Sequence, residues 1–202
     1  MEIKLTPDDK SKIIKSILNK YAKVSEAPDG LFKYPTGKSG LEGQNYDSDI
    51  IKSLPESVID SYCGVGNPFS IGPIIKGDVV LDIGCGGGVD TMVAALLVGS
   101  EGKAVGIDMT PDMVERATKN LQEASIENVT FQQGSAEDLP FLDDSFDVVI
   151  SNGVFNLIAD KKRALEEVFR VLKSGKHLMI ADQVLTSDPP KNTKSMVESW
   201  YR

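Results

Sequence analysis

The chain has 202 residues, of which 41% are hydrophobic, and this length is sufficient for one domain with a substantial core. Its formal net charge of −8 argues against a nucleic-acid partner, because phosphate contacts need clustered Lys and Arg. Two cysteines, Cys63 and Cys85, cannot make a disulfide framework, and no run is apolar over a membrane-spanning length, so we expect a cytoplasmic protein without stable membrane insertion.

A helix is predicted at the start of the chain. Thr6 suits its N-cap, Pro7 suits its first turn, and Asp9 completes a variant of the capping box. The apolar residues that follow recur on one helical face: Ile13, Ile14, Ile17, Leu18 and Tyr21. One side of this helix should therefore be buried.

The segment after this helix, residues 26–48, is rich in glycine and polar residues and is too long for a simple connection. We interpret residues 1–55 as a helix and an ordered loop that fold over the ligand-binding edge of a core formed by residues 56–202. A loosely attached extension is the alternative.

Strand and helix patterns alternate in the rest of the chain. Strands are predicted near 79–84, 103–109, 129–134, 146–152 and 176–184, and helices near 89–99, 111–125 and 160–173. This alternation indicates a doubly wound α/β fold, with a mostly parallel sheet and helices on both faces. The last helix is expected to bury Leu165, Val168, Phe169 and Leu172 and to end at a glycine cap, Ser174-Gly175.

The first of these strands runs into a glycine-rich turn. Gly84, Gly86 and Gly88 remove the side chains that would keep a ligand from the backbone, and the next helix points its amides at the same place. Asp108, at the tip of the second strand, is well placed to bind the two hydroxyls of a ribose. Together these features predict a nucleoside-binding pocket.

The spacing of the glycines distinguishes between nucleosides. A dinucleotide fingerprint requires a third glycine at position 89, which is Val89, whereas the observed pattern is Asp82 followed by G-x-G-x-G. No basic residue lies in 79–90, 134–141 or 146–157, which suits a cationic ligand better than a pyrophosphate. A hydride-transfer enzyme is therefore a distant alternative.

These motifs resemble those of the class I S-adenosylmethionine-dependent methyltransferases, which have a Rossmann-like sheet. The resemblance implies S-adenosylmethionine as cofactor, S-adenosylhomocysteine as its product, a small-molecule substrate and no metal. It implies that the following residues contact the cofactor: Asp82, Gly84, Cys85, Gly86, Gly88, Asp108, Met109, Ala136, Glu137 and Asn152. Met109 stands where a side chain commonly packs on adenine, and Cys85 is interpreted as a spacer in the glycine turn.

Within this class the chain is most similar to the arsenite methyltransferases, through Gly64-Val65-Gly66-Asn67-Pro68 and Ser151-Asn152-Gly153. The resemblance implies arsenic-binding cysteines at the positions of Val65 and Gly153, and both are absent; Cys63 lies two positions from the first. Arsenite or another soft nucleophile is one interpretation of the acceptor. The alternatives are a quinone-type C-methyltransferase, which residues 137–141 would also fit, and a non-catalytic cofactor-binding subunit.

No catalytic residue can be assigned from the sequence. Five residues, each near the first strand or the ends of the fourth and fifth, are candidates for the acceptor pocket: Cys63, Asn67, Phe155, Asn156 and Asp182. The single histidine, His177, is interpreted as a surface residue at the start of the fifth strand.

Proteins of this class usually continue past the fifth strand with a helix and two antiparallel strands, which this chain lacks. We therefore expect a fragment whose fifth strand has an open edge. A homodimer partner or residues 186–202 could cover that edge instead. Because an arsenic-binding cysteine follows a tryptophan in the arsenite enzymes, a UGA selenocysteine codon soon after Trp200 is a further alternative to a natural stop or a trimmed chain.

Overall fold

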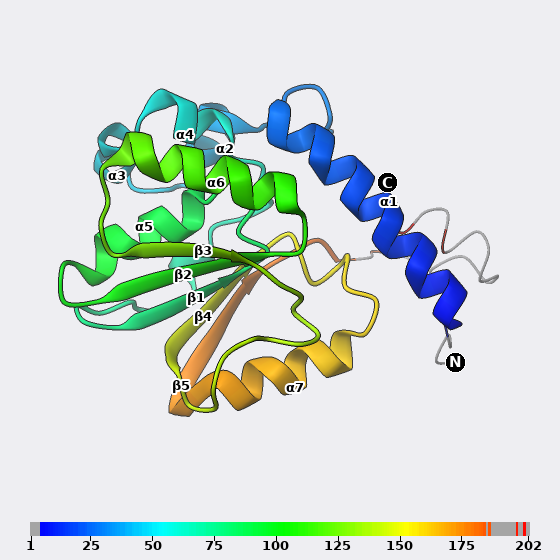
Figure 1. Cartoon of the computed structure of the whole chain (residues 1–202). Coiled ribbons are helices and arrows are strands. Elements are labelled where there is room, and N and C mark those ends of the chain that lie inside the picture. Colours follow the sequence, from blue (N-terminus) through cyan, green and yellow to red (C-terminus); the bar gives the residue numbers. More distant parts are fainter. Residues whose placement is uncertain (1–4, 185, 187–196, 198–199, 201–202) are drawn as a thin grey trace.

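A computed structural model describes residues 5–184, 186, 197 and 200 of the chain (Figure 1). The helices are α1 (Pro7–Glu26), α2 (Gly37–Gly43), α3 (Ser48–Ser53), α4 (Glu56–Asp60), the 3-10 turn η1 (Pro68–Ser70), α5 (Val89–Val98), α6 (Pro111–Ala124) and α7 (Lys161–Val171). The strands are β1 (Val79–Ile83), β2 (Lys103–Asp108), β3 (Val129–Gln133), β4 (Phe146–Asn152) and β5 (Leu172–Ala181).

The described strands form one sheet in the order β3-β2-β1-β4-β5, and every pair is parallel. β1 and β4 lie inside the sheet with both faces covered, so almost every residue of the two strands is buried. The prediction of a doubly wound α/β sheet is confirmed. The strand order reverses between β1 and β4, and ligands bind at this point in such sheets.

Helices cover both faces of the sheet (Figure 1). On one face α5 and α6 pack over a core that contains Val80, Ala94 and Val148. On the other face α7 packs over a core that contains Leu81, Val149 and Val168. Successive residues of β1 thus point into different cores, as the pleat of a strand requires.

The capping box predicted for α1 is confirmed. The amide of Asp9 donates to Thr6 Oγ1 over 3.2 Å, and the amide of Thr6 donates to Asp9 Oδ2 over 3.0 Å. α1 lies beside α6 at the end of the sheet where the strands finish, and Lys10 Nζ lies 3.0 Å from Asp160 Oδ2 (Figure 1). Part of the segment 26–48, predicted as a loop, forms α2 instead.

The helix before β5 differs from its prediction in both its end and its buried face. α7 ends at Val171 with Leu172 as an extended C-cap, and Gly175 (φ 76°) lies within an irregular stretch of β5. The stretch after α7 pairs with β4 from Leu172 onward, and Lys173 Nζ donates to Asp147 Oδ2 over 2.7 Å.

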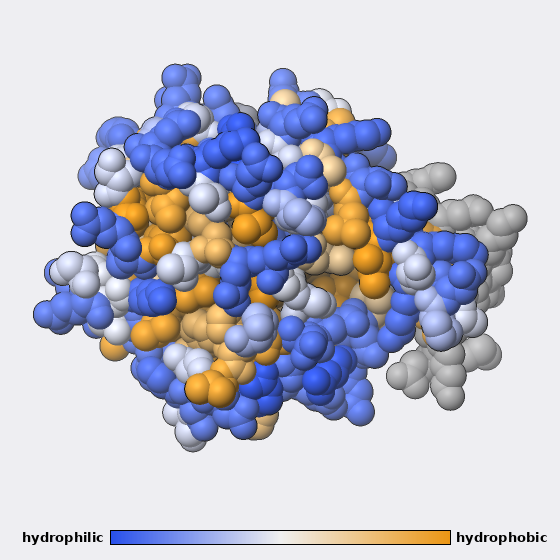
Figure 2. All heavy atoms as spheres, in the orientation of Figure 1, coloured by the Kyte–Doolittle hydropathy of each residue, from blue (hydrophilic) through white to orange (hydrophobic). Residues whose placement is uncertain are grey.

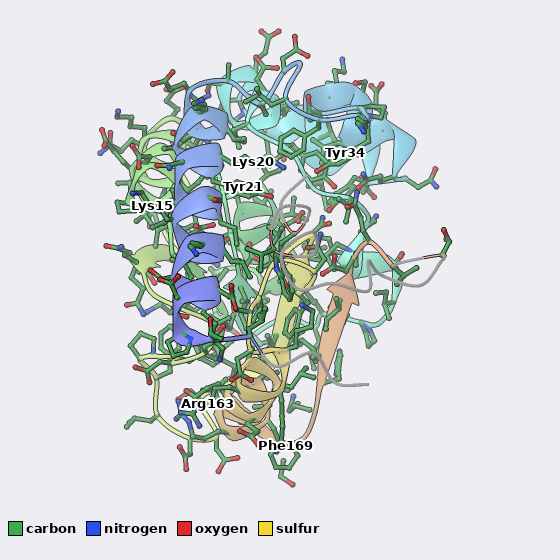
Figure 3. The ribbon with its side chains drawn as sticks, turned by 90° about the vertical axis from the view of Figure 1, so that its right-hand side faces the viewer. Lys15, Lys20, Tyr21, Tyr34, Arg163 and Phe169 are labelled. Atoms are coloured by element: carbon green, nitrogen blue, oxygen red, sulfur yellow. The ribbon has the colours of Figure 1, made fainter. Side chains whose placement is uncertain are left out.

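The predicted stripe of α7 was wrong in part. Val168 is buried, but Leu165 is 45% exposed and Phe169, on the outer side of the helix, is 83% exposed (Figure 3). Glu167 takes an inward position because it accepts bonds from the amide of Leu139 and from Arg170. A buried, fully paired carboxylate is not visible to a hydrophobic pattern.

None of the helices in the described ranges has the length and apolar character needed to cross a membrane. Predictions about the chain beyond β5, including the open edge and the segment 186–202, fall largely on residues outside the described ones. Within the described part, β5 is an edge strand.

Candidate cofactor site

A cavity opens where β1, β2 and β4 end, and α1 covers one side of it. Its volume is about 1180 Å³, including the part open to solvent. The glycine turn after β1 and the ends of β2 and β4 form its floor, while Ile13, Ile17 and Tyr21 of α1 form part of its cover. Figure 2 shows apolar side chains along the side of α1 that faces the rest of the molecule.

The turn after β1 requires glycine at two of its positions, Gly84 and Gly88. Gly84 and Gly88 have φ of 73° and 85°, values that side chains rarely adopt. A Cβ on Gly84 would lie 2.3 Å from Val154 Cγ2, and one on Gly88 would lie 2.5 Å from Phe131 Cζ. Gly84 and Gly86 line the cavity, whereas Gly88 lies behind them as the N-cap of α5.

Asp108 links the end of β2 to this turn. Its Oδ2 accepts from the amide of Gly86 over 3.0 Å, and its Oδ1 accepts from the amide of Thr110 over 2.8 Å. A carboxylate oxygen has two lone-pair directions, so each retains acceptor capacity toward the cavity that Asp108 lines. This arrangement fits the two vicinal hydroxyls of a ribose.

The residues expected at the nucleoside base lie next to Asp108. Met109, Ala136 and Glu137 all line the cavity, and Met109 also packs against Ile13 and Ile17 of α1. Glu137 Oε1 accepts from the amide of Asp160 over 2.9 Å, which ties this loop to the start of α7. Apolar side chains therefore stand on two sides of the place predicted for adenine.

A second polar cluster lies at the other end of the glycine turn and was not foreseen from the sequence. Asp90, in the first turn of α5, accepts from the hydroxyl of Tyr46 over 2.7 Å and from Asn152 Nδ2 over 2.9 Å. Asn152 Oδ1 in turn accepts from the amides of Val65 and Gly66, over 2.8 and 3.1 Å. This network joins the glycine turn, the end of β4 and the segment before β1.

The cavity carries an excess of negative charge. Among the described residues that line it there are four acids and no Lys, Arg or His. Burial raises the pKa of Asp90 to about 6, and it also raises the pKa values of Asp82 and Asp108 above their usual range. Buried carboxylates without a cation make a site that favours a positively charged ligand.

The predicted acceptor residues do not all reach the cavity. Cys63 lines it, and burial raises the pKa of its thiol to about 12, so the thiol is neutral at physiological pH. The other four candidates do not line it. Asn67 caps η1 by accepting from the amide of Phe69, and Phe155 packs in the core, 8% exposed. Asn156 donates its amide to Asp182 Oδ2, so these two residues brace one loop.

The positions at which the resemblance implies arsenic-binding cysteines face each other. A Cβ on Gly153 would lie 3.2 Å from Val65 Cγ1, and Gly153 lines the cavity. In this chain the two side chains at these positions are the isopropyl group of Val65 and the hydrogen atom of Gly153, and neither can bind arsenic. Among the described residues, no group of three or more His, Cys, Asp or Glu side chains could hold a metal ion.

Only weak sequence signals pointed to the residues that were missed. Asp90 stands in the first helical turn after the glycines, where an acid is also a common helix-dipole partner. Tyr46 and Tyr62 belong to the segment before β1. Nothing in their spacing indicates that the centres of their rings lie 5.5 Å apart beside Asp90. Long-range contacts of this kind become visible only in the folded chain.

Comparison with known proteins agrees with this geometry. The family described as Methyltransferase domain matches residues 74–201. The chain therefore belongs to the class I S-adenosylmethionine-dependent methyltransferases, whose positively charged cofactor suits a cavity lined by acids.

Within that class it is similar to an arsenite methyltransferase of Halobacterium salinarum, with 39% identity over 159 residues, 79% of this chain and 40% of the relative. A solved arsenic(III) S-adenosylmethionine methyltransferase of Chlamydomonas reinhardtii is 37% identical, with a TM-score of 0.56 over 74% of this chain and 50% of that one. A demethylmenaquinone methyltransferase of Symbiobacterium thermophilum is 37% identical over 100 residues, 49% of this chain and 40% of the relative. The chain thus spans about half or less of each of these proteins.

Proposed function

We propose that this protein binds S-adenosylmethionine and transfers its methyl group to a small-molecule acceptor. The observation that carries this proposal is the acid-lined cavity at the ends of β1, β2 and β4, closed on one side by a turn that requires glycine at positions 84 and 88. When bound, the cofactor supplies a methyl group already activated by a sulfonium. The protein has to orient that group, exclude water and align a nucleophile roughly 3 Å away.

The residues present fit this cofactor. Asp108 would hold the ribose, Met109, Ala136 and Glu137 would surround the base, and the glycine turn would lie against the rest of the nucleoside. Asp82 is 2% exposed and accepts a hydrogen bond from Thr91 Oγ1 over 2.6 Å. This bond holds the first turn of α5 against the end of β1. Asn152 would face the amino-acid end of the cofactor.

Calorimetry on the purified chain tests the first part. We expect S-adenosylmethionine and S-adenosylhomocysteine to bind with one site each and NAD to show no heat of binding. Tight NAD binding without S-adenosylmethionine binding would contradict the proposal and revive the hydride-transfer alternative.

For the acceptor we propose a soft nucleophile, of which arsenite is the first to test. Cys63 is a thiol on the cavity wall, which supports a soft acceptor, but no second thiol stands at Val65 or Gly153 to form a chelating pair. We therefore expect weak arsenite binding that depends on Cys63 alone. Arsenite titration of wild type and Cys63→Ser, followed by transfer of a labelled methyl group, measures this dependence.

A quinone-type C-methyltransferase is the second candidate. The apolar cover, with Ile13, Ile14 and Leu157 at the cavity, and the similarity to a demethylmenaquinone methyltransferase favour it. Methylation of a short-chain demethylmenaquinol with labelled cofactor would support this candidate over a soft acceptor. Cofactor binding with no methylated product in a cell extract would instead favour a non-catalytic subunit.

A further inference from the structure

We infer that Asn120 of α6 is a positioning residue for the cofactor. Its side-chain amide fixes the glycine turn after β1 and joins that turn to the segment that carries Cys63. This inference rests on the proposed function, and it adds a residue that does not itself line the cavity. It follows from the burial of Asn120, from its hydrogen bonds and from the close contact between Gly87 and Ser61.

Asn120 is a buried polar residue in the interior of a helix. It lies within α6 and is 1% exposed. Asparagine is a poor helix former, and burial of an amide costs free energy unless hydrogen bonds satisfy it. α6 lies beside α4 and packs on β2 and β3 (Figure 1). The amide therefore needs partners inside the molecule, and its partners are two residues that line the cavity.

Both partners of the amide nitrogen are hydrogen-bond acceptors. Asn120 Nδ2 donates to the carbonyl of Gly87 over 2.8 Å and to Ser61 Oγ over 2.9 Å. The Ser61 hydroxyl donates its own hydrogen to the carbonyl of Val58 over 2.6 Å, so Ser61 Oγ acts as the acceptor toward Asn120. A side chain at this position has to supply two donors, and the NH2 group of asparagine does so.

The bond to Gly87 fixes the peptide group between Gly87 and Gly88. At one end of this group, the amide of Gly88 donates to the carbonyl of Cys85 over 2.8 Å. At the other end, Asn120 holds the carbonyl of Gly87. Because a peptide group is planar, bonds at both ends determine its orientation. Asn120 thereby determines the path of the turn where Gly86 and Gly87 line the cavity.

The bond to Ser61 joins the turn to the opposite wall of the cavity. A Cβ on Gly87 would lie 2.5 Å from Ser61 Oγ, so the turn and Ser61 are in direct contact. Ser61, Tyr62 and Cys63 follow one another in the chain, and all three line the cavity. Without the amide, the Gly87 carbonyl and Ser61 Oγ would lie close together with no donor between them. Asn120 therefore holds the glycine turn and the wall that carries Cys63 in one arrangement.

A second asparagine provides a matched control that separates positioning from stability. Asn128 Nδ2 also donates to carbonyls, those of Ala95, Gly99 and Gly102, but at the C-terminal end of α5 and outside the cavity lining. Replacement of either asparagine by aspartate keeps the shape of the side chain and removes its donors.

We expect Asn120→Asp to weaken the binding of S-adenosylhomocysteine at least about tenfold in calorimetry, and Asn128→Asp to leave it unchanged. Urea unfolding should show that both variants are less stable than the wild type, because both lose buried hydrogen bonds. Unchanged affinity of folded Asn120→Asp, or an equal loss of affinity in the two variants, would overturn the inference.

Two uncharged variants test the same role without a buried carboxylate. Asn120→Ala should weaken S-adenosylhomocysteine binding about three- to tenfold, with Asn128→Ala as its unchanged control. Ser61→Ala removes one acceptor and leaves the bond to Gly87, so its loss of affinity should be smaller than that of Asn120→Ala. An equal loss in Ser61→Ala would overturn the role given to the Gly87 carbonyl. Failure of the wild-type chain to bind S-adenosylhomocysteine would instead refute the proposed function.

Discussion

The floor and the cover of the cavity are held in place by different kinds of contact. The floor, residues 82–90, 108–110 and 152–154, depends largely on the backbone: the amide of Gly84 donates to the carbonyl of Ile107 over 2.8 Å, and that of Gly86 donates to Asp108. The cover, α1 and residues 44–66, is attached through side chains: Tyr46 donates to Asp90 of the floor, and Lys10 of α1 donates to Asp160 at the start of α7. A change in the floor should therefore act on both folding and binding, whereas a change in the cover should act on one contact at a time.

The largest effect is expected from the glycine turn. Gly84→Ala combines a left-handed φ of 73° with a Cβ 2.3 Å from Val154, and should destabilise the chain by about 3 kcal/mol. Gly86→Ala is the control, because its φ is also positive, at 52°, but its Cβ would meet nothing within 4 Å. We expect the control to lose about 1 kcal/mol. Urea unfolding measures both, and equal losses would show that the contact with Val154 does not matter.

Removal of the carboxylate at the end of β2 should have the next largest effect. Asp108→Ala is expected to weaken S-adenosylmethionine binding by about 1–3 kcal/mol, because both the ribose contact and the bond to the amide of Gly86 are lost. Asp112→Ala, in the first turn of α6 but outside the cavity lining, is the matched control. Unchanged affinity of Asp108→Ala in calorimetry would mean that the ribose lies elsewhere.

The affinity for S-adenosylmethionine should depend on pH through Asp90, which lies where the cover contacts the floor. Because burial raises the pKa of Asp90 to about 6, this carboxyl is protonated at acid pH in the free protein and binds a cation only after it ionises. Affinity for S-adenosylmethionine should therefore rise about tenfold between pH 5 and pH 7. An affinity that is flat over this range would contradict the role given to Asp90.

The stability of the free protein should change in the opposite direction. A pKa that is raised in the folded state gives stability that is fully present below the unfolded value near 4 and is lost as the pH passes 6. The raised pKa values of Asp82 and Asp108 act with the same sign. Unfolding free energies should fall by about 1 kcal/mol from pH 5 to pH 7, and Asp90→Asn should reduce this slope.

The smallest effect is expected in the cover. Tyr46→Phe removes the hydroxyl that donates to Asp90 over 2.7 Å and should cost about 1 kcal/mol of stability. Loss of this donor should also raise the pKa of Asp90 further, and so move the midpoint of cofactor binding to higher pH. Tyr34→Phe removes a hydroxyl that donates to the carbonyl of Cys63 instead, and should leave the midpoint where it is. A shift of equal size in both variants would show that the effect is not local to Asp90.

The fold and the floor could be predicted from the sequence because their signals are local. A strand of continuous apolar residues, three glycines at fixed spacing and an acid at the next strand end all lie within residues 79–108, and each acts on its own backbone or on an adjacent strand. The capping box at Thr6 and Asp9 is local in the same way. Predictions made only from the periodicity of hydrophobic residues were wrong in part, because Phe169 of α7 is exposed and Glu167 is buried.

The cover, and the part of the cavity that lies beside it, were decided by tertiary structure. The residues that meet there come from positions as far apart as Tyr21, Cys63 and Gly153, and no spacing rule joins residues separated by more than a hundred positions. Asn67 and Phe155 were placed near the pocket by their order in the chain, but backbone capping and core packing direct them elsewhere. The sequence by itself therefore determined the class of fold and the cofactor motif, because the residues that form a strand end or a glycine turn are neighbours in the sequence. Only the folded chain decided which side chains line the rest of the cavity, because that depends on how distant segments pack.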